Sequence, residues 1–139
     1  MRALGLDLGS KTLGIALSDP SGLIASPYTV IRHEEDYDSL VDQVKTLVFE
    51  LQIESIVLGF PKNMNNTIGP KGELSLSFQK KLEEKISVPV FLQDERLSTK
   101  SAHDILIEGD MSRKKRKNVV DAMAATIILQ NYLDRRNGS

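Results

Sequence analysis

Hydrophobic and polar residues alternate along the first part of the chain, a pattern that predicts β-strands with two different faces. Strands are expected over residues 2–9 and 12–18, and a turn over 19–22 leads into a third strand over 28–32. Alternation gives the first two strands a bulky face (Leu4, Leu6, Leu8, Leu13, Ile15, Leu17) and a small face (Ala3, Gly5, Asp7, Gly14, Ala16, Ser18). Small side chains predict that a helix can approach this second face closely, near Asp7.

From residue 36 onward, hydrophobic residues recur at helical spacing between shorter hydrophobic runs. A helix capped by Asp36 or Asp38 is expected along Leu40, Val44, Leu47, Val48 and Leu51. A strand over 55–59 follows, and Pro70 then starts a helix along Leu74, Phe78, Leu82 and Ile86. The remaining elements are a strand over 88–93, a helix over 98–109 and a last helix over about 119–133. Phe49 and Phe78 fall on the helices and are expected in the core.

This order of elements predicts an α/β fold with a five-stranded mixed sheet. The first three strands form an antiparallel meander, and right-handed crossovers make the fourth and fifth strands parallel to the first. Helices are expected on both faces of the sheet. The chain has 139 residues, of which 40% are hydrophobic, which suits one domain over residues 1–139.

Three acidic residues, Asp7, Glu95 and Asp121, interrupt segments whose pattern otherwise predicts burial. A carboxylate removed from water is costly unless it is paired, hydrogen-bonded or bound to a metal. In an open α/β sheet the functional crevice lies beyond the carboxyl ends of the strands, where Asp7 and Glu95 are expected. The last helix can supply Asp121. The three positions therefore indicate one shared cation and a metal-dependent enzyme.

Composition narrows the kind of metal site. The chain has no Cys and two His, which excludes disulfides, thiolate metal sites and a His-rich zinc centre. A metal held by oxygen is expected, with Mg²⁺ or Mn²⁺ preferred. No hydrophobic run approaches the roughly 18 residues of a membrane span, and no secretory leader is evident, so we expect a cytoplasmic protein without membrane contact.

Five motifs are spread along nearly the whole chain. They are Asp7-Leu8-Gly9-Ser10-Lys11-Thr12 with Gly14, Gly59-Phe60-Pro61, Asn66-Thr67 with Gly69-Pro70, Asp94-Glu95-Arg96-Leu97-Ser98-Thr99, and Val120-Asp121 with Ala124-Ala125. Together they resemble the motifs of the YqgF family of ribonuclease H-like nucleases. Members of this family are described as nucleases of pre-16S ribosomal RNA and as Holliday-junction resolvases. The resemblance implies a ribonuclease H-like fold, catalytic carboxylates at Asp7, Glu95 and Asp121, and pre-16S ribosomal RNA or branched DNA as substrate. Ribosomal particles are a further partner that it allows.

Two positions depart from the related patterns. Asn65-Asn66-Thr67 stands where the family usually has Asp-Gly-Thr, although Asn also tolerates a left-handed backbone. Resolvases of the RuvC type carry a further acid one turn after the last catalytic Asp, where this chain has Ala124. The first departure affects the details of that loop and leaves the three acids intact, whereas the second weakens the analogy with junction cleavage.

Phosphodiester hydrolysis explains why carboxylates would gather. The reaction adds negative charge to an anionic phosphate, and two Mg²⁺ ions about 4 Å apart can activate water and stabilise the leaving oxygen. By analogy with the fold, Asp7 is expected to bridge the ions, with Glu95 and Asp121 as outer ligands. Each acid alone also has a structural explanation, as a turn cap, an ion-pair partner or a first-turn helix residue.

The run Arg113, Lys114, Lys115, Arg116 and Lys117 concentrates five positive charges in a chain of net charge −1. A uniformly basic nucleic-acid binder is therefore excluded, whereas local phosphate contacts or a solvated loop are both compatible with the run. Other candidates for phosphate contacts are Lys11, Thr12, Arg96, Ser98 and Thr99. Each of these is also compatible with an ordinary turn or cap.

Two other function classes remain open on sequence. Asp-x-Gly followed by Lys-Thr-x-Gly is also similar to the phosphate loop of actin-like ATPases, which enclose nucleotide between two such domains. A noncatalytic RNA-binding or ribosome-assembly module is the second alternative. The sequence does not choose between RNA ends and four-way DNA junctions, nor between a monomer and a homodimer, although symmetric cleavage of a junction requires two active sites.

Overall fold

The protein is built on one five-stranded mixed sheet. The structure, a computed structural model, describes residues 2–61, 69–94 and 113–137, with only the backbone described over 113–121. The strands are β1 (Ala3–Leu8), β2 (Thr12–Ser18), β3 (Ala25–Arg32), β4 (Ser55–Phe60) and β5 (Val90–Asp94), in the spatial order β3-β2-β1-β4-β5. The first three are antiparallel neighbours, and β4 and β5 run parallel to β1. The predicted sheet topology is confirmed.

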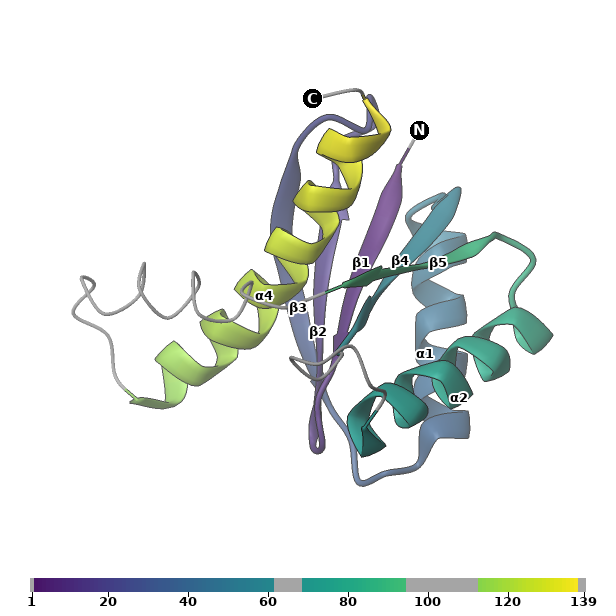
Figure 1. Ribbon diagram of the computed structural model, residues 1–139, viewed down its shortest axis with the longest axis vertical. Coiled ribbons are helices and arrows are strands. Elements are labelled where there is room, and N and C mark those ends of the chain that lie inside the picture. The colour runs from purple at the N-terminus through teal and green to yellow at the C-terminus, as the bar shows by residue number, and fades with distance from the viewer. Residues whose placement is uncertain (1, 62–68, 95–112, 138–139) are drawn as a thin grey trace.

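Helices cover both faces of this sheet (Figure 1). α1 (Tyr37–Glu50) and α2 (Pro70–Lys85) lie on one face, and α4 (Arg113–Arg136) lies on the other. Asp36 is the N-cap of α1, because its carboxylate accepts a hydrogen bond of 3.1 Å from the Ser39 amide. Pro70 begins α2 as predicted. The helix predicted over 98–109 lies outside the described residues.

The bulky and small faces of the first strands pack as the alternation predicts. Leucine and isoleucine of β1 and β2 form a core with α1 and α2 that includes Leu6, Ile15, Leu40, Phe78 and Leu82. The small face packs on α4 through Ala3, Ala16 and Val57, which contact Ala125, Ile128, Leu129 and Leu133. Close packing of this kind stabilises the fold by about 25 cal/mol for each Å² of buried apolar surface.

The direction of α4 is fixed at its C-terminal end. The side chain of Gln130 accepts a hydrogen bond of 2.8 Å from the Ala25 amide, and Asn137 donates one of 3.1 Å to the Gly22 carbonyl. The same turn adjoins the start of β1, where the Ala3 amide donates to the Ser18 hydroxyl at 2.7 Å. α4 therefore runs antiparallel to β1, and its first turns lie toward the end where β1 stops (Figure 1).

Some predicted boundaries were wrong. β3 begins at Ala25, ahead of the predicted residue 28, because its first residues are polar or small and are specified by pairing with β2. α4 begins at Arg113, so the basic run is part of the helix and does not form a loop before it. Lys and Arg are good helix formers, but a wholly polar turn gives no hydrophobic periodicity to detect.

Phe49 is not a core residue, contrary to the sequence prediction, because its side chain is 85% exposed. The buried stripe of α1 consists of Leu40, Val41 and Val44. At about 100° per residue, Phe49 lies on the opposite side of the helix from that stripe. Phe78, by contrast, is buried as predicted. Within the described parts of the chain, the helices lack a stretch long and hydrophobic enough to cross a membrane.

Candidate functional site

Asp7 lies near the carboxyl end of β1, the central strand of the sheet. It pairs with Gly14 of β2 and is half-buried. Its side chain shares a face with Gly5, two residues earlier, and that face packs against α4. The sequence prediction that Asp7 stands on the small face is therefore confirmed.

The register of the parallel strands defines what lies level with Asp7. Leu6 pairs with Leu58, and Gly59 pairs with Gln93, so Asp7, Gly59 and Gln93 stand at about the same height on three adjacent strands. Neighbouring strands are about 4.8 Å apart, which puts β5 roughly 10 Å from β1. Gly59 places no side chain between the other two.

α4 brings the backbone of residue 121 to the same end of the sheet. Gly5 lies against Ala125, and Asp121 is one turn before Ala125, about 6 Å along the helix. Asp7 is two residues beyond Gly5, about 6.6 Å along the strand. Because α4 and β1 are antiparallel, moving from Ala125 back to residue 121 and moving from Gly5 forward to Asp7 lead toward the same end of the sheet.

Several predicted site residues are not tested by the structure. Glu95, Arg96, Ser98 and Thr99 lie outside the described residues. Asp121 and the basic residues Arg113, Lys114, Lys115, Arg116 and Lys117 lie on the backbone of α4, without a description of their side chains. No group of three or more potential metal ligands is found among the described side chains, which include only one of the three acids. The metal site stays a prediction.

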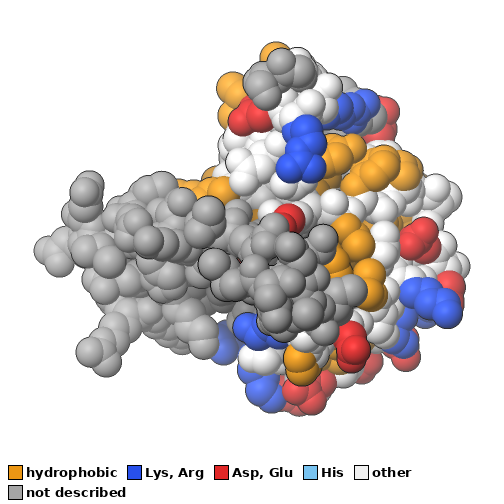
Figure 2. Space-filling model, viewed as in Figure 1, with side chains coloured by type: hydrophobic (Ala, Val, Ile, Leu, Met, Phe, Trp, Pro, Cys, Tyr) orange, Lys and Arg blue, Asp and Glu red, His pale blue; other side chains and the backbone are white. Residues whose placement is uncertain are grey.

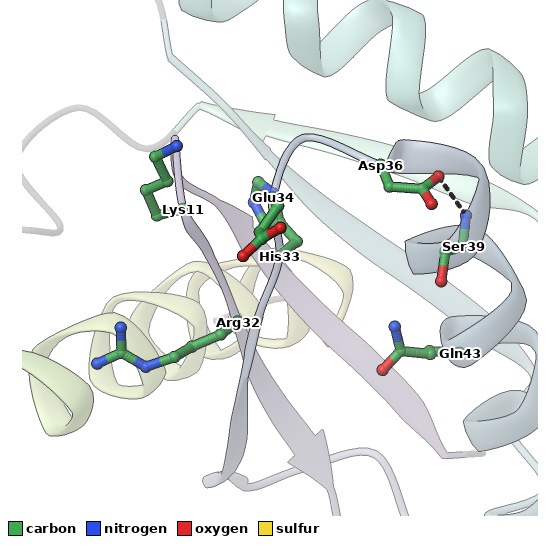
Figure 3. Close-up of a pocket in the computed structure, with 7 residues that line it drawn as sticks. All are labelled: Lys11, Arg32, His33, Glu34, Asp36, Ser39 and Gln43. Atoms are coloured by element: carbon green, nitrogen blue, oxygen red, sulfur yellow. Dashed lines mark hydrogen bonds between the residues drawn. The ribbon is translucent and has the colours of Figure 1, made fainter.

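A polar pocket of about 770 Å³ opens beside the loop that follows Asp7. Its walls come from the β1–β2 loop, the end of β3 and the start of α1, and its lining residues are Lys11, Arg32, His33, Glu34, Asp36, Ser39 and Gln43 (Figure 3). Of these, only Lys11 was a predicted site residue. Arg32 and His33 were not predicted, because the end of an edge strand carries no local pattern that marks a side chain as lining a pocket.

Lys11 and Arg32 are the two cationic side chains that line the pocket. Among the described side chains, neither Lys11 nor Arg32 forms an ion pair, and Arg32 extends away from Asp36 (Figure 3). Thr12, also a predicted phosphate contact, is buried, and its carbonyl accepts a hydrogen bond of 2.7 Å from the Gly9 amide. This environment favours a role for Thr12 in shaping the loop.

The wider surface carries interspersed charges. Acidic and basic side chains lie near one another at several places on the face shown in Figure 2. Tyr37 has a pKa raised above its ordinary value by burial and by the nearby negative charge of Glu35. Mixed charge agrees with the prediction that any nucleic-acid contact is local.

Comparison with known proteins places these features in a family. The family model described as "RuvX: Holliday junction resolvase" matches residues 1–135. A "Putative pre-16S rRNA nuclease" of Listeria monocytogenes serotype 4b (strain CLIP80459) is 52% identical over 138 residues, which cover 99% of this chain and 100% of the relative. A protein of the same name from Bacillus subtilis (strain 168) is 53% identical with the same coverage.

A solved structure supports the fold. Thermus thermophilus RuvC has a TM-score of 0.60 with this chain, 16% sequence identity, and coverage of 99% of this chain and 97% of that one. At this identity the similarity shows the fold alone. The predicted ribonuclease H-like architecture is thereby confirmed.

Proposed function

Because the chain belongs to the RuvX family of Holliday junction resolvases, we propose that it is a metal-dependent nuclease that hydrolyses phosphodiester bonds of pre-16S ribosomal RNA. The observation that carries this proposal is the identity of 52–53% over nearly the full length to relatives named for that activity. We also expect the protein in the cytoplasm and in contact with ribosomal particles.

We propose Asp7, Glu95 and Asp121 as the catalytic carboxylates. Asp7 and the backbone of residue 121 lie at the same end of β1 and α4, which supports a shared site for two of them. The ring of Phe91 stacks on that of Tyr132 in α4, with the ring centroids 5.5 Å apart. The odd-numbered residues of β5 therefore face α4. Glu95 lies outside the described residues, and its place in the site stays a prediction from the sequence.

The donor set fits Mg²⁺ or Mn²⁺. The three proposed ligands are all carboxylates, and these ions prefer oxygen. When bound, two such ions would activate water and stabilise the leaving oxygen of the phosphodiester. Asp7, held on the central strand, is the proposed bridging ligand.

We assign substrate phosphate contacts to Lys11 and to the basic residues at 113–117, with Arg32 as an addition from the structure. Lys11 and Arg32 are exposed and line the pocket beside the β1–β2 loop. The basic run forms the first turns of α4, upstream of residue 121. Arg96, Ser98, Thr99 and Thr12 remain predicted contacts. Phosphate contacts would position the strand without reading its sequence.

One cleavage panel tests the proposal and its main alternative. The protein with Mg²⁺ or Mn²⁺ is incubated with an RNA that carries the 5′ precursor end of 16S ribosomal RNA and, separately, with a four-way DNA junction. We expect cleavage of the RNA. Cleavage of the junction alone would favour the resolvase named by the family description, and a dimer would then be expected. RNA binding without any cleavage would favour an assembly module.

A further inference from the structure

The loop that joins β1 to β2 begins two residues after Asp7 and consists of Gly9, Ser10 and Lys11. The Gly9 amide donates a hydrogen bond of 2.7 Å to the Thr12 carbonyl, which closes the loop. A Cβ atom on Gly9 would stand 3.2 Å from both the carbonyl oxygen and Oγ1 of Thr12. Little space is left, so the loop has little freedom to change its path near Gly9.

His33, the residue that follows β3, holds this loop. Its amide donates a hydrogen bond of 2.9 Å to the Lys11 carbonyl, and its ring Nε2 lies 3.0 Å from the Gly9 carbonyl. The side chain is 8% exposed. One residue therefore binds the first and the last carbonyl of the loop, from a position 24 residues away from Gly9 in the sequence.

The hydrogen bond to the second ring nitrogen identifies the tautomer of the imidazole. The Glu35 amide donates to Nδ1 at 3.1 Å, so Nδ1 is an acceptor. The proton of the neutral ring is then on Nε2, which donates to the Gly9 carbonyl. Glu35 has a φ of 67°, a left-handed conformation that is uncommon outside glycine. This backbone turn accompanies the hydrogen bond from the Glu35 amide to the ring of His33, two residues earlier.

The ring also has a firm support. Its centroid lies 5.5 Å from that of Tyr37, and Tyr37 in turn contacts Phe78 edge-on at 6.3 Å. Phe78 is part of the core between the sheet and the two helices of that face. The imidazole thus connects the loop after Asp7 to the rigid interior of the protein.

We propose that His33 is a positioning residue of the nuclease site. Its neutral imidazole fixes the β1–β2 loop. The loop in turn fixes the path of the backbone after Asp7 and the position of Lys11 in the pocket. This inference rests on the proposed function for its effect on cleavage, but the hold on the loop is independent of it. His33 acts through Gly9 and Lys11 and touches no reacting atom, so it is not a catalytic residue.

Two substitutions separate the two hydrogen bonds of the ring. In His33→Gln, the side-chain amide nitrogen replaces Nε2 and can still donate to the Gly9 carbonyl. In His33→Asn, the shorter amide replaces Nδ1, accepts from the Glu35 amide and does not reach Gly9. The two variants have similar polarity, so a purely structural role would not predict a large difference between them. Glu35→Gly is a matched control, because it keeps the amide donor and suits the left-handed backbone.

Hydrogen exchange, measured residue by residue by NMR, is the first readout. We expect the amides of Gly9 and residue 33 to exchange at least about tenfold faster in His33→Asn than in His33→Gln, at similar melting temperatures, because local opening of the loop becomes easier. Equal exchange of these two amides in both variants would overturn the proposed hold on the loop. Glu35→Gly should match the wild-type protein.

Cleavage of the RNA substrate is the second readout. We expect kcat of His33→Asn to fall by about 10- to 100-fold, the usual effect of losing a partner that orients a metal ligand, while His33→Gln stays closer to the wild type. Equal kcat values in the two variants would overturn the role in positioning. If the wild-type protein cleaves neither substrate, the proposed function fails, and the exchange comparison still tests the hold on the loop.

Discussion

Gly5 of β1 lies directly against Leu129 of α4. A Cβ atom on Gly5 would stand 2.8 Å from the Cβ of Leu129 and 3.0 Å from the carbonyl oxygen of Ala125. Both atoms are fixed to the helix backbone, so a side chain at position 5 would push the helix away from the sheet. Because Asp7 follows Gly5 on the strand and residue 121 precedes Ala125 on the helix, this contact sets how close the two chain segments come.

Gly5→Ala should therefore lower both stability and activity. We expect the free energy of unfolding to fall by about 1–3 kcal/mol, the usual cost of overpacking a core. Cleavage should fall further than the folded fraction, because displacement of α4 separates the segments that carry Asp7 and residue 121. Urea denaturation and cleavage at a temperature where the variant is folded measure the two effects.

Ser26→Ala, at an exposed position on β3, is the control for this prediction and should change stability by less than about 0.5 kcal/mol. Unchanged stability of Gly5→Ala would contradict the close packing.

Divalent metal should stabilise the protein if the carboxylates share ions. A ligand that binds only the folded state adds about 2.7 kcal/mol of stability when its concentration is 100 times its dissociation constant. We therefore expect Mg²⁺ or Mn²⁺ at millimolar concentration to raise the melting temperature, as followed by circular dichroism. The same concentration of K⁺, at matched ionic strength, is the control. Absence of a shift with both divalent ions would exclude the shared metal site.

Asp7→Asn should remove cleavage without unfolding the protein. Loss of a direct metal ligand is expected to cost more than the roughly 10- to 100-fold that loss of an outer-shell partner costs. Without metal, the variant should be as stable as the wild type or more stable, because one of several mutually repelling charges is gone. Single-turnover cleavage and denaturation in EDTA measure these outcomes. A large loss of stability in EDTA would instead indicate that Asp7 has a structural role.

Neutralising residues 113–117 should weaken binding to all nucleic acids alike. Because the run lies within α4, replacement by Gln keeps the helical propensity while removing the charge. Each lost phosphate contact should flatten the slope of log affinity against log salt by about 0.7 for single strands and 0.9 for duplex DNA. Binding titrations at several salt concentrations give this slope. If the slope is unchanged, these residues do not contact phosphate.

The ionised carboxylate of Asp19 should stabilise the folded protein, and this stabilisation should be lost at low pH. Its carboxylate accepts hydrogen bonds from the Ser21 hydroxyl and from the amides of Leu23 and Ile24, and the first of these contributes most to lowering its pKa from 3.8 to about 2. Since the folded-state pKa is depressed, the stabilisation is complete above about pH 4 and is lost as pH falls toward 2. The difference in melting temperature between the wild type and Asp19→Asn should therefore shrink over that interval. A constant difference from pH 7 to pH 2 would contradict this assignment.

The arrangement of the sheet and the faces of its strands followed from the sequence alone. The two-residue period of β1 and β2 is a local property of the chain, so alternation predicted that Gly5 and Asp7 would share the small face. The same holds for the Pro70 start, which depends on neighbouring residues. The cap of α1 was narrowed to Asp36 or Asp38 by the sequence, and the structure selects Asp36. The position of Asp7 at the carboxyl end of the central strand followed from the strand order.

Contacts between distant segments were decided by the tertiary structure. The start of α4 is polar and shows no hydrophobic period, so only the folded chain places the basic run within the helix. The antiparallel course of α4 depends on Gln130 and the turn before β3, which are about a hundred residues apart. His33 binds carbonyl groups of the β1–β2 loop, and because every residue has a carbonyl, no sequence pattern can identify the ones that it holds.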